Sequence, residues 1–276
     1  MFVENIFQET EGRVLVYFYI KCSNCSYCLR GEDNLCLYFK RIGFEEWGEY
    51  AEYIKVPIKN PIPLPKQLDF SVAILVDAGA TTYRAFRKIY PLPGSIMAII
   101  GIGGLGGMVI QIAKAFEVQV LAIDILDEKL TYAKKLGADY ILNFKDIRYK
   151  DINNVRNVLK KNLNINYVNA VIDTVGSNDT LSLGMYTVGR SGRIILLGYG
   201  KEKSLSISPI KIIYDEIVLE GSRGVSKWEV YEILQLAKKN LIVPNVTNEY
   251  KLENVNVAIN DFRAGKILGR SIIKFD

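Results

Sequence analysis

The stretch IMAIIGIGGLGG at residues 96–107 decides the fold of this chain. Its first five residues are apolar and mostly β-branched, as in a buried strand, and Gly101, Gly103 and Gly106 follow at G-x-G-x-x-G spacing. The next apolar side chains recur at helical spacing: Met108, Val109, Ile112, Ala113 and Phe116. Strand, tight turn and helix in this order bring backbone N–H groups and a helix N-terminus to one point, where a pyrophosphate binds. The stretch therefore predicts a dinucleotide-binding unit.

Asp124 supports this prediction from the next strand. Residues 118–125 (VQVLAIDI) form a second apolar run, and Asp124 lies eighteen positions after Gly106 (124 minus 106). A carboxylate there accepts hydrogen bonds from the ribose hydroxyls of the adenosine half and repels a 2′-phosphate. No arginine or lysine follows at 125 or 126, so the sequence favours NAD over NADP. Taken alone, Asp124 reads equally as a solvated strand end that begins the next helix.

The rest of the chain alternates strands and helices. Apolar runs predict strands at 139–144, 167–173, 192–198 and 216–221, with helices at 127–136 and 151–161 between them. This alternation predicts an α/β fold with a doubly wound parallel (Rossmann) sheet. Further on, Ser226 and Glu229 form a capping-box pattern for a helix to about residue 240. A second helix is expected from Glu253 and a last strand at 270–275.

Four cysteines lie near the start of the chain, spaced C-x2-C-x2-C-x7-C, and the sequence contains no others: Cys22, Cys25, Cys28 and Cys36. Such a short loop suits a closed, tetrahedral, four-thiolate zinc site with a structural role. Two disulfides are the first alternative, although the tight spacing argues against them. An iron–sulfur cluster is the second, but bacterial ferredoxin motifs place the fourth cysteine after three residues and before proline.

Composition narrows the function classes. With 49% hydrophobic and 24% charged residues over 276 positions, the chain is long enough for two domains. Charges are interleaved and the net charge is +5, so nucleic acid is not an expected partner. No apolar run is long enough for a membrane span and no leader pattern is seen, which predicts a cytoplasmic protein without a membrane partner. Histidine, the usual proton carrier and metal ligand, is absent.

Several motifs together resemble the zinc-dependent medium-chain alcohol dehydrogenases. Besides the four cysteines and Asp124, they are GEYAEY at 48–53, DAGATTY at 77–83, GIGGLGG at 101–107, KKLGAD at 134–139, GRIILLG at 192–198 and GR at 269–270. The resemblance implies a Rossmann domain at 78–222. It also implies a chaperonin-10-like β domain, incomplete here and carrying the four-cysteine zinc lobe, at 1–77, to which residues 223–276 return.

The resemblance also implies roles for single residues. Asp77 takes the place of a ligand of a second, catalytic zinc, although alone it reads as a helix N-cap or a partly buried acid. Thr81 would touch the nicotinamide ring, Leu105 would back it, and Arg270 would reach the pyrophosphate. The cofactor-binding set is completed by Gly104, Lys129 and Gly198, beside the glycines and Asp124 named above.

The departure from the family lies upstream. The family's other catalytic-zinc ligands, a cysteine and the histidine of a G-H-E motif, precede the cysteine lobe. Met1 corresponds to a point inside the N-terminal domain, so about 80 to 90 residues of that domain are expected to be missing. Prolines at 57–65 suggest a connector that interrupts pairing. Residues 14–20 (VLVYFYI) would then expose an unpaired, aggregation-prone strand that oligomerises or captures a partner.

Three functions follow as hypotheses. The first is an NAD-dependent zinc alcohol or polyol dehydrogenase of which this is the larger part. In this hypothesis the 276-residue polypeptide binds NAD(H) and one structural zinc, lacks the catalytic zinc and does not turn over alcohols alone. The second is a catalytically silent NAD(H)-binding protein with a partner chain. The third, a zinc module for nucleic acid, is disfavoured by the dispersed charge. The resemblance implies alcohol or aldehyde substrates and a homo-oligomer, dimer or tetramer.

Overall fold

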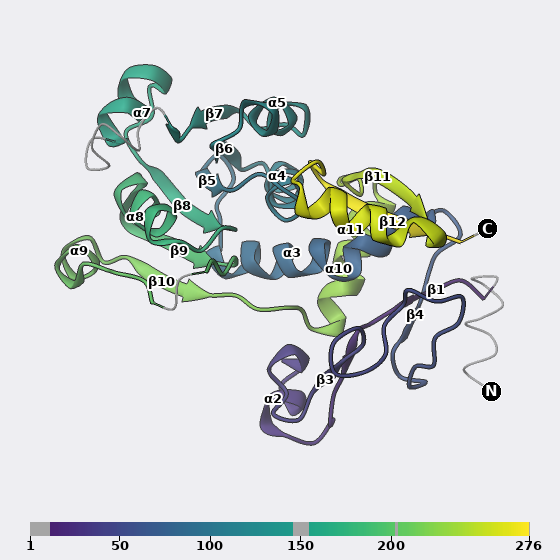
Figure 1. Cartoon of the computed structure of the whole chain (residues 1–276). Helices are drawn as coiled ribbons and strands as arrows, with labels where there is room; N and C mark the ends of the chain where they lie inside the picture. Colours follow the sequence, from purple (N-terminus) through teal and green to yellow (C-terminus); the bar gives the residue numbers. More distant parts are fainter. Residues whose placement is uncertain (1–11, 146–154, 202–203, 276) are drawn as a thin grey trace. The chain divides into compact units, whose positions relative to one another are not determined.

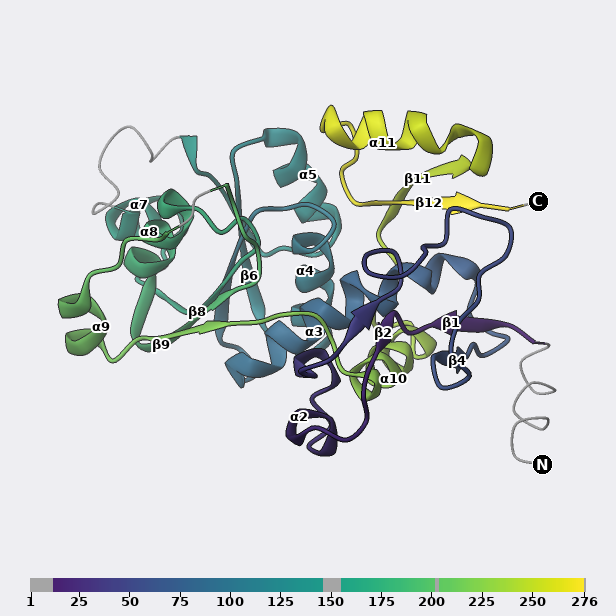
Figure 2. The same ribbon diagram turned by 60° about the horizontal axis from the view of Figure 1, so that its bottom comes forward.

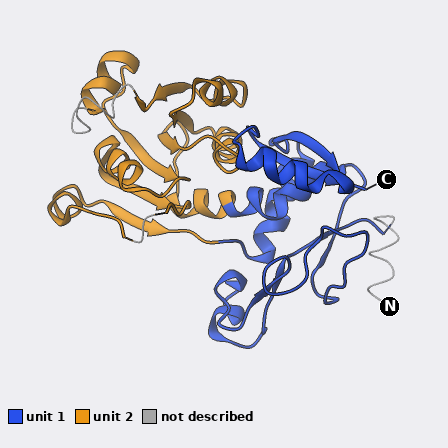
Figure 3. Cartoon of the chain, viewed as in Figure 1, with its two compact units in different colours: residues 1–81, 224–276 blue, residues 82–223 orange. Residues whose placement is uncertain are grey.

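A computed structural model describes residues 12–145, 155–201 and 204–275. The chain divides into two compact units, shown in two colours in Figure 3. Unit 1 combines residues 1–81 with 224–276, and unit 2 is continuous from Thr82 to Arg223. The predicted helix at 151–161 begins outside the described residues. Within the described residues, α7 spans Val155–Leu163.

Unit 2 is built on a six-stranded parallel sheet in the order β10-β9-β8-β5-β6-β7. Its strands are β5 (Ile96–Ile100), β6 (Gln119–Asp124), β7 (Tyr140–Asn143), β8 (Val168–Asp173), β9 (Val188–Leu196) and β10 (Val218–Gly221). The connecting helices are α4 (Gly106–Ala115), α5 (Asp127–Lys135), α7 (Val155–Leu163), α8 (Asn178–Thr187) and α9 (Pro209–Asp215). The predicted doubly wound Rossmann sheet is confirmed.

Helices cover both faces of this sheet, as Figure 1 shows, with α7 and α8 on one side and α4 and α5 on the other. Alternating strand residues such as Ala98 and Ile100 pack in one apolar cluster with Leu159 of α7 and Leu181 of α8. Their neighbours along each strand point to the opposite face, because side chains alternate along a strand. Both faces are therefore buried, which is why the strands read as continuous apolar runs.

The strand order reverses between β5 and β8. From β5 the chain moves to β6 and β7 on one side, and then crosses to β8, β9 and β10 on the other. The loops that leave β5 and β8 diverge there, and ligands of open parallel sheets bind at such a point, beyond the carboxyl ends of the strands. The glycine-rich turn leaves β5 at this position.

In unit 1, β1 (Val14–Val16) pairs antiparallel with β4 (Pro61–Pro63). Two predictions are wrong here: residues 14–20 are not an unpaired strand, and the prolines at 57–65 do not interrupt all pairing. Backbone bonds from Leu64 N–H to Arg13 and from Tyr17 N–H to Asn60 flank the register. The prolines therefore fall at non-hydrogen-bonded positions of the ladder, where a missing N–H costs nothing. Within the same run Leu15, Tyr17 and Tyr19 are buried.

The cysteine segment follows β1. β2 (Tyr19–Ile20) pairs with β3 (Lys40–Arg41), and the short helices α2 (Ser26–Leu29) and η1 (Asp33–Leu35) lie between them. The GEYAEY motif at 48–53, which supports the family resemblance, forms no strand: the structure assigns these residues neither a strand nor a ladder partner within the described chain. The side chains of Tyr50 and Tyr53 are exposed there, at 67% and 90%.

The remaining elements of unit 1 are helical or belong to a small sheet. The 3-10 helix η2 (Phe70–Val76) runs into α3 (Ala78–Ile89), which continues into unit 2. α10 (Lys227–Lys238) confirms the predicted capping box, since the Ser226 N–H donates to the Glu229 carboxylate over 2.8 Å. β11 (Val246–Lys251) pairs in parallel with β12 (Arg270–Lys274), and α11 (Val255–Arg263) runs alongside them in Figures 1 and 2. No helix in the described ranges combines the length and the apolar character needed to cross a bilayer.

Candidate functional site

The glycine turn of unit 2 depends on three glycines for different reasons. Gly101 has φ of +88°, which favours glycine, and its N–H donates to the Ile123 carbonyl of β6. A Cβ on Gly106 would lie 2.1 Å from the Gly101 carbonyl oxygen, so that position closes the turn on itself. A Cβ on Gly103 would meet no atom within 4 Å. The second glycine therefore leaves open space in which a ligand's phosphates can approach the backbone.

Asp124 ends β6 directly beside this turn. Its carboxylate is 7% exposed and accepts the Ile102 N–H at 2.7 Å through Oδ2. Oδ1 accepts the N–H groups of Ile125 at 2.7 Å and Leu126 at 3.1 Å. Asp124 thus fixes the glycine turn to the end of β6, a structural role that sequence reasoning missed. A carboxylate has about four acceptor sites, so capacity remains for a ribose hydroxyl.

Other residues predicted to bind cofactor are placed around the same edge of the sheet. Leu105 immediately precedes α4, and Gly104 lies between it and Gly103. Lys129 is half-buried in the first turn of α5. The Gly198 N–H donates to the Asp173 carbonyl at 3.0 Å, and a Cβ on Gly198 would lie 2.2 Å from the Thr174 backbone.

Two residues at the end of β8 were not singled out from the sequence. Asp173 is fully buried, and its Oδ1 accepts the N–H groups of Val175 at 2.8 Å and Gly176 at 3.0 Å. Burial raises the pKa of this carboxyl above its usual range, although those two N–H groups oppose the shift. The Thr174 hydroxyl donates to the Gly101 carbonyl at 2.8 Å. Together they join the end of β8 to the glycine turn. The sequence did offer a signal for Asp173, because this acid, like Asp124, stands at the carboxyl end of an apolar strand.

In unit 1 the four predicted zinc ligands come together. The Sγ atoms of Cys22, Cys25, Cys28 and Cys36 all lie within 4.8 Å of one another. The Sγ atoms of Cys22 and Cys28 are 3.9 Å apart, close to the edge of a tetrahedron with zinc–sulfur bonds of about 2.3 Å. The cysteines are not paired as disulfides. Among the described residues, these four cysteines form the one group of three or more metal-binding side chains that lie close enough together to hold an ion.

Backbone N–H groups point at the sulfur atoms, as thiolate ligands require. Cys36 Sγ accepts from Cys22 N at 3.3 Å and from Tyr38 N at 3.4 Å. Hydrogen bonds from the N–H groups of Cys28 and Leu37 lower the pKa of Cys25 to about 6, whereas burial raises the pKa of Cys28 to about 12. A bound cation offsets this burial penalty, because it favours the thiolate form. The donor set therefore fits a divalent zinc ion.

Asp77 and Arg270, predicted to contact a catalytic zinc and the pyrophosphate, lie in unit 1 opposite each other. An Asp77 Oδ2 oxygen is 3.6 Å from Arg270 Nη2, and the two side chains are 57% and 32% exposed. Asp77 directly precedes α3, and its carbonyl accepts the Thr81 N–H at 2.8 Å. The Thr81 hydroxyl lies 3.5 Å from the Asp77 carboxylate. Thr81 itself is buried.

Comparison with known proteins identifies the family. Residues 104–239 match the zinc-binding dehydrogenase family model, and residues 9–66 match the alcohol dehydrogenase GroES-like domain. An alcohol dehydrogenase of Geobacillus stearothermophilus is 31% identical over 261 residues, which cover 94% of this chain and 74% of that protein. The chain belongs to the zinc-binding medium-chain alcohol dehydrogenase family. Its members of known sequence include an NAD-dependent alcohol dehydrogenase of Sulfurisphaera tokodaii, 33% identical over 91% of this chain and 71% of that protein.

Solved alcohol dehydrogenase structures agree with this assignment. The enzyme from Aeropyrum pernix superposes with a TM-score of 0.82 at 32% identity, covering 94% of this chain and 75% of that one. Acetophenone reductase from Geotrichum candidum, solved in complex with NAD, gives a TM-score of 0.83 at 27% identity, over 94% of this chain and 72% of that one. The predicted GroES-like domain with a four-cysteine cluster is therefore confirmed beside the Rossmann sheet of this alcohol dehydrogenase family member.

Proposed function

We propose that this alcohol dehydrogenase family member binds NAD(H) through unit 2 and serves hydride transfer between an alcohol and NAD. The observation that carries the proposal is the open space over Gly103, next to the buried carboxylate of Asp124, where the strand order reverses. The Gly103 backbone and the start of α4 would hold the pyrophosphate. Asp124 would accept a hydrogen bond from the adenosine ribose. When bound, the nicotinamide ring supplies the acceptor for the hydride.

The cofactor preference follows from charge. The Asp124 carboxylate accepts a hydrogen bond from Ile102 in the open turn, and the two residues after it, Ile125 and Leu126, are apolar. A 2′-phosphate on the ribose would bring two negative charges to a buried carboxylate with no cation supplied by these positions. We therefore assign NAD rather than NADP.

The four cysteines would hold one structural zinc. Four thiolates fill a tetrahedral ion and leave no position for water or substrate, so this ion stabilises the fold and takes no part in the reaction. Its support here is the mutual approach of the sulfur atoms within 4.8 Å and the N–H groups directed at Cys36. Metal analysis of the purified chain should give one zinc per polypeptide.

Alcohol turnover needs more than this chain supplies. A zinc that lowers the pKa of a bound alcohol needs three protein ligands and an open position. The 276 residues contain no histidine, and all four cysteines belong to the structural cluster. The resemblance offers Asp77 as a candidate ligand, and the Arg270 guanidinium lies 3.6 Å from its carboxylate. We propose that the polypeptide binds NAD(H) but does not oxidise alcohols on its own; the second candidate function is accordingly a catalytically silent NAD(H)-binding protein with a partner chain.

The test combines three readings on one preparation of the 276-residue chain. Zinc content, NADH binding by nucleotide fluorescence, and NADH production from primary and secondary alcohols are measured with and without added Zn²⁺. We expect one zinc, saturable NADH binding and no turnover. Turnover by the isolated chain would contradict the inactivity and leave NAD binding standing. Zinc without NADH binding would reject the NAD proposal and leave the metal site standing.

We also propose that the chain forms a homo-oligomer through the β10 edge of unit 2. β10 is the terminal strand of the sheet, so one of its sides has no partner within the described strands. The neighbouring helix α9 exposes Ile210, Ile213 and Tyr214, each by more than two thirds. An open edge beside exposed apolar side chains is a surface on which a second sheet edge can pair. Light scattering at several protein concentrations tests this, and a monomer throughout would reject it.

A further inference from the structure

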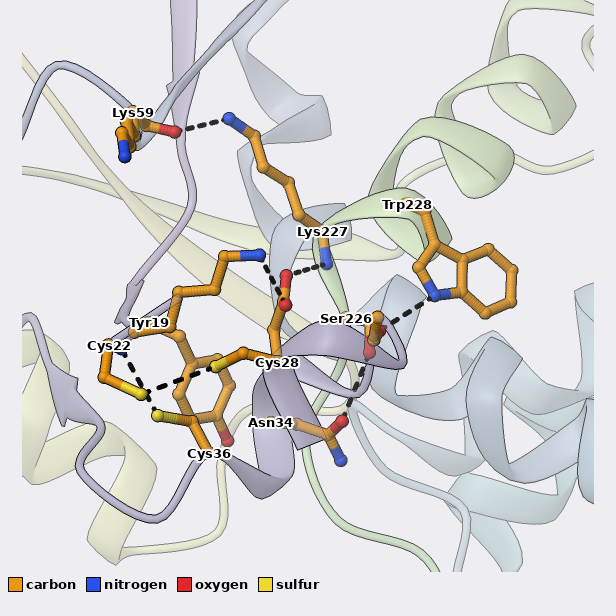
Figure 4. A network of polar contacts seen from close by, with 12 residues as sticks. Tyr19, Cys22, Cys28, Asn34, Cys36, Lys59, Ser226, Lys227 and Trp228 are labelled. Atoms are coloured by element: carbon orange, nitrogen blue, oxygen red, sulfur yellow. Dashed lines mark hydrogen bonds and ion pairs between the residues drawn. The ribbon is translucent and has the colours of Figure 1, made fainter. Parts of the chain in front are cut away.

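The zinc lobe, defined as residues 21–36, is bound to the start of α10 by hydrogen bonds between residues far apart in the sequence. Figure 4 shows these contacts beside the cysteines. The Ser226 hydroxyl donates to Asn34 at 3.2 Å, the Lys227 N–H donates to Asp33 at 3.4 Å, and Trp228 Nε1 donates to the Gly31 carbonyl at 3.3 Å. The residues joined are 192 to 197 positions apart. Both partners belong to unit 1.

Residues outside the lobe bind the same short segment. The Tyr17 hydroxyl donates to the Val225 carbonyl at 2.8 Å in a buried position. Lys227 Nζ donates to the Lys59 carbonyl at 2.5 Å. A Cβ on Gly224, which has φ of +53°, would lie 2.2 Å from the Tyr19 hydroxyl oxygen. The segment at 224–228 thus contacts both the cysteine lobe and the residues that flank the lobe, and Val225 and Ser226 are buried there.

Asp33 and Asn34 make the link on the lobe side. They lie between the third and fourth cysteines, in η1, and are 3% and 1% exposed. Lys21 Nζ, one residue before Cys22, is 2.5 Å from Asp33 Oδ1 and offsets its charge. Buried polar groups are costly unless their partners are held in place. The conformation of the cysteine loop therefore decides whether the partners of Ser226 and Lys227 are present.

A second capped helix in the same chain shows what is unusual about α10. At α8 the Ser177 hydroxyl accepts the Thr180 N–H at 3.2 Å, and the Ser177 N–H donates to Thr180 Oγ1 at 2.9 Å. That cap is satisfied within its own helix. At α10 the capping box between Ser226 and Glu229 is closed in the same way, and the Ser226 hydroxyl in addition donates to Asn34 in the lobe. The first turn of α10 is therefore hydrogen-bonded to the lobe as well as capped by its own residues, whereas the cap of α8 is made within α8.

We propose that zinc binding to the four cysteines and the folding of the first turn of α10 are thermodynamically coupled, with Asn34 and Ser226 as the joining pair. The inference rests on the structural zinc of the proposed function. Zinc orders the loop that carries Asp33 and Asn34, and the ordered loop holds residues 225–228 in position. Because coupling between two sites is reciprocal, contacts made at Ser226 must in turn strengthen zinc binding.

Hydrogen exchange on the full chain, with and without zinc, tests the first direction. Removing zinc with a chelator should speed amide exchange in residues 226–231 as well as in the cysteine loop. Residues 177–183 at the start of α8 should exchange at an unchanged rate and serve as the internal control. Faster exchange confined to the zinc lobe, residues 21–36, would overturn the proposal.

Zinc release tests the reverse direction. The Ser226→Ala variant loses the bond to Asn34 and should release zinc to a chelator about fivefold faster than the parent, the usual contribution of one such bond. The matched control is Ser177→Ala, which removes an equivalent cap in unit 2 and should release zinc at the parent rate. In the double variant Ser226→Ala with Asn34→Ala, the two effects should not add.

The outcomes separate this proposal from the one it rests on. If metal analysis finds no zinc in the parent chain, the structural zinc site itself is wrong. If zinc is present but Ser226→Ala and Ser177→Ala release it equally, the coupling is wrong and the zinc site stands. Were Ser226→Ala to fold poorly, Trp228→Phe offers a milder test, because it removes the Nε1 donor to Gly31 while keeping an aromatic ring, and it should also speed zinc release.

Discussion

The carboxylate of Asp77 faces the guanidinium of Arg270, with Oδ2 and Nη2 3.6 Å apart. Family resemblance assigned these two residues to different ligands, a catalytic zinc and a pyrophosphate. In the structure they neutralise each other within unit 1. A guanidinium close to a lone carboxylate opposes the binding of a further cation there.

Asp77→Asn should therefore leave the zinc content unchanged at one ion per chain. The Asp77 side chain is more than half exposed, so loss of the pair should change the free energy of unfolding by no more than about 1 kcal/mol. Elemental analysis and a denaturant titration measure the two quantities. A fall in zinc content in this variant would mean that Asp77 does ligate metal.

The glycine turn predicts opposite outcomes for two similar substitutions. In Gly103→Ala the added methyl enters open space, so the fold should remain stable while NADH affinity drops at least about tenfold, since phosphates could no longer approach the backbone. In Gly106→Ala the methyl would lie 2.1 Å from the Gly101 carbonyl oxygen, so the chain should unfold at a markedly lower temperature. Thermal melts and nucleotide fluorescence distinguish the two. Equal effects of both variants on stability would count against a ligand site over Gly103.

Asp124→Ala should weaken NADH binding at least about tenfold, because a charged acceptor for a ribose hydroxyl is lost. The variant also removes the acceptor of the Ile102 N–H, so a stability control is needed. Asp139→Ala is matched, since Asp139 accepts the Val120 N–H at 2.7 Å at the other end of β6. It should lower stability comparably and leave NADH affinity unchanged. Equal NADH binding by both variants would remove Asp124 from the cofactor site.

The cysteines should differ in reactivity once zinc is removed. Hydrogen bonds from backbone N–H groups lower the pKa of Cys25 to about 6, so its thiolate predominates at pH 7. Burial raises the pKa of Cys28 to about 12, which keeps it as the thiol. Iodoacetamide at pH 7 should therefore modify Cys25 first and Cys28 last, as peptide mass spectrometry would record. Early modification of Cys28 would show that the loop of the metal-free chain differs from the structure.

Asp173 gives a pH dependence of opposite sign to the usual carboxylate. Burial raises its pKa in the folded state, so its contribution to stability is lost as the pH rises through the folded pKa. Asp173→Asn keeps an acceptor for the Val175 and Gly176 N–H groups and carries no charge. At pH 7 its melting temperature should lie above that of the parent by up to about 4 °C. The difference should vanish at acidic pH. A large loss of stability at pH 7 would show that the folded state requires the charged form.

Much of unit 2 could be predicted from the sequence because its signals are local. Continuous apolar runs indicate strands that are buried on both faces. The spacing from Gly101 to Asp124 indicates a glycine turn and an acid that belong to one strand–helix–strand unit. The cysteine cluster was predictable for the same reason, since all four ligands fall within fifteen residues.

Unit 1 was predicted less well because its structure depends on distant partners. Proline at 61 and 63 argued against pairing, yet the register with Val14 and Val16 places both at positions that need no N–H. The GEYAEY motif at 48–53 carried part of the family resemblance, but a strand also needs a neighbour, and the described residues provide none. Likewise, nothing local to Asn34 indicates a bond to Ser226, 192 positions away.

The most direct test of the account is a fluorescence titration of the purified 276-residue chain with NADH and, in parallel, with NADPH. We expect saturable binding of one NADH per chain and an affinity for NADPH at least about tenfold lower, because Asp124 repels the 2′-phosphate. Absence of saturable NADH binding, or a preference for NADPH, would contradict the assignment of the Gly103 and Asp124 site to NAD.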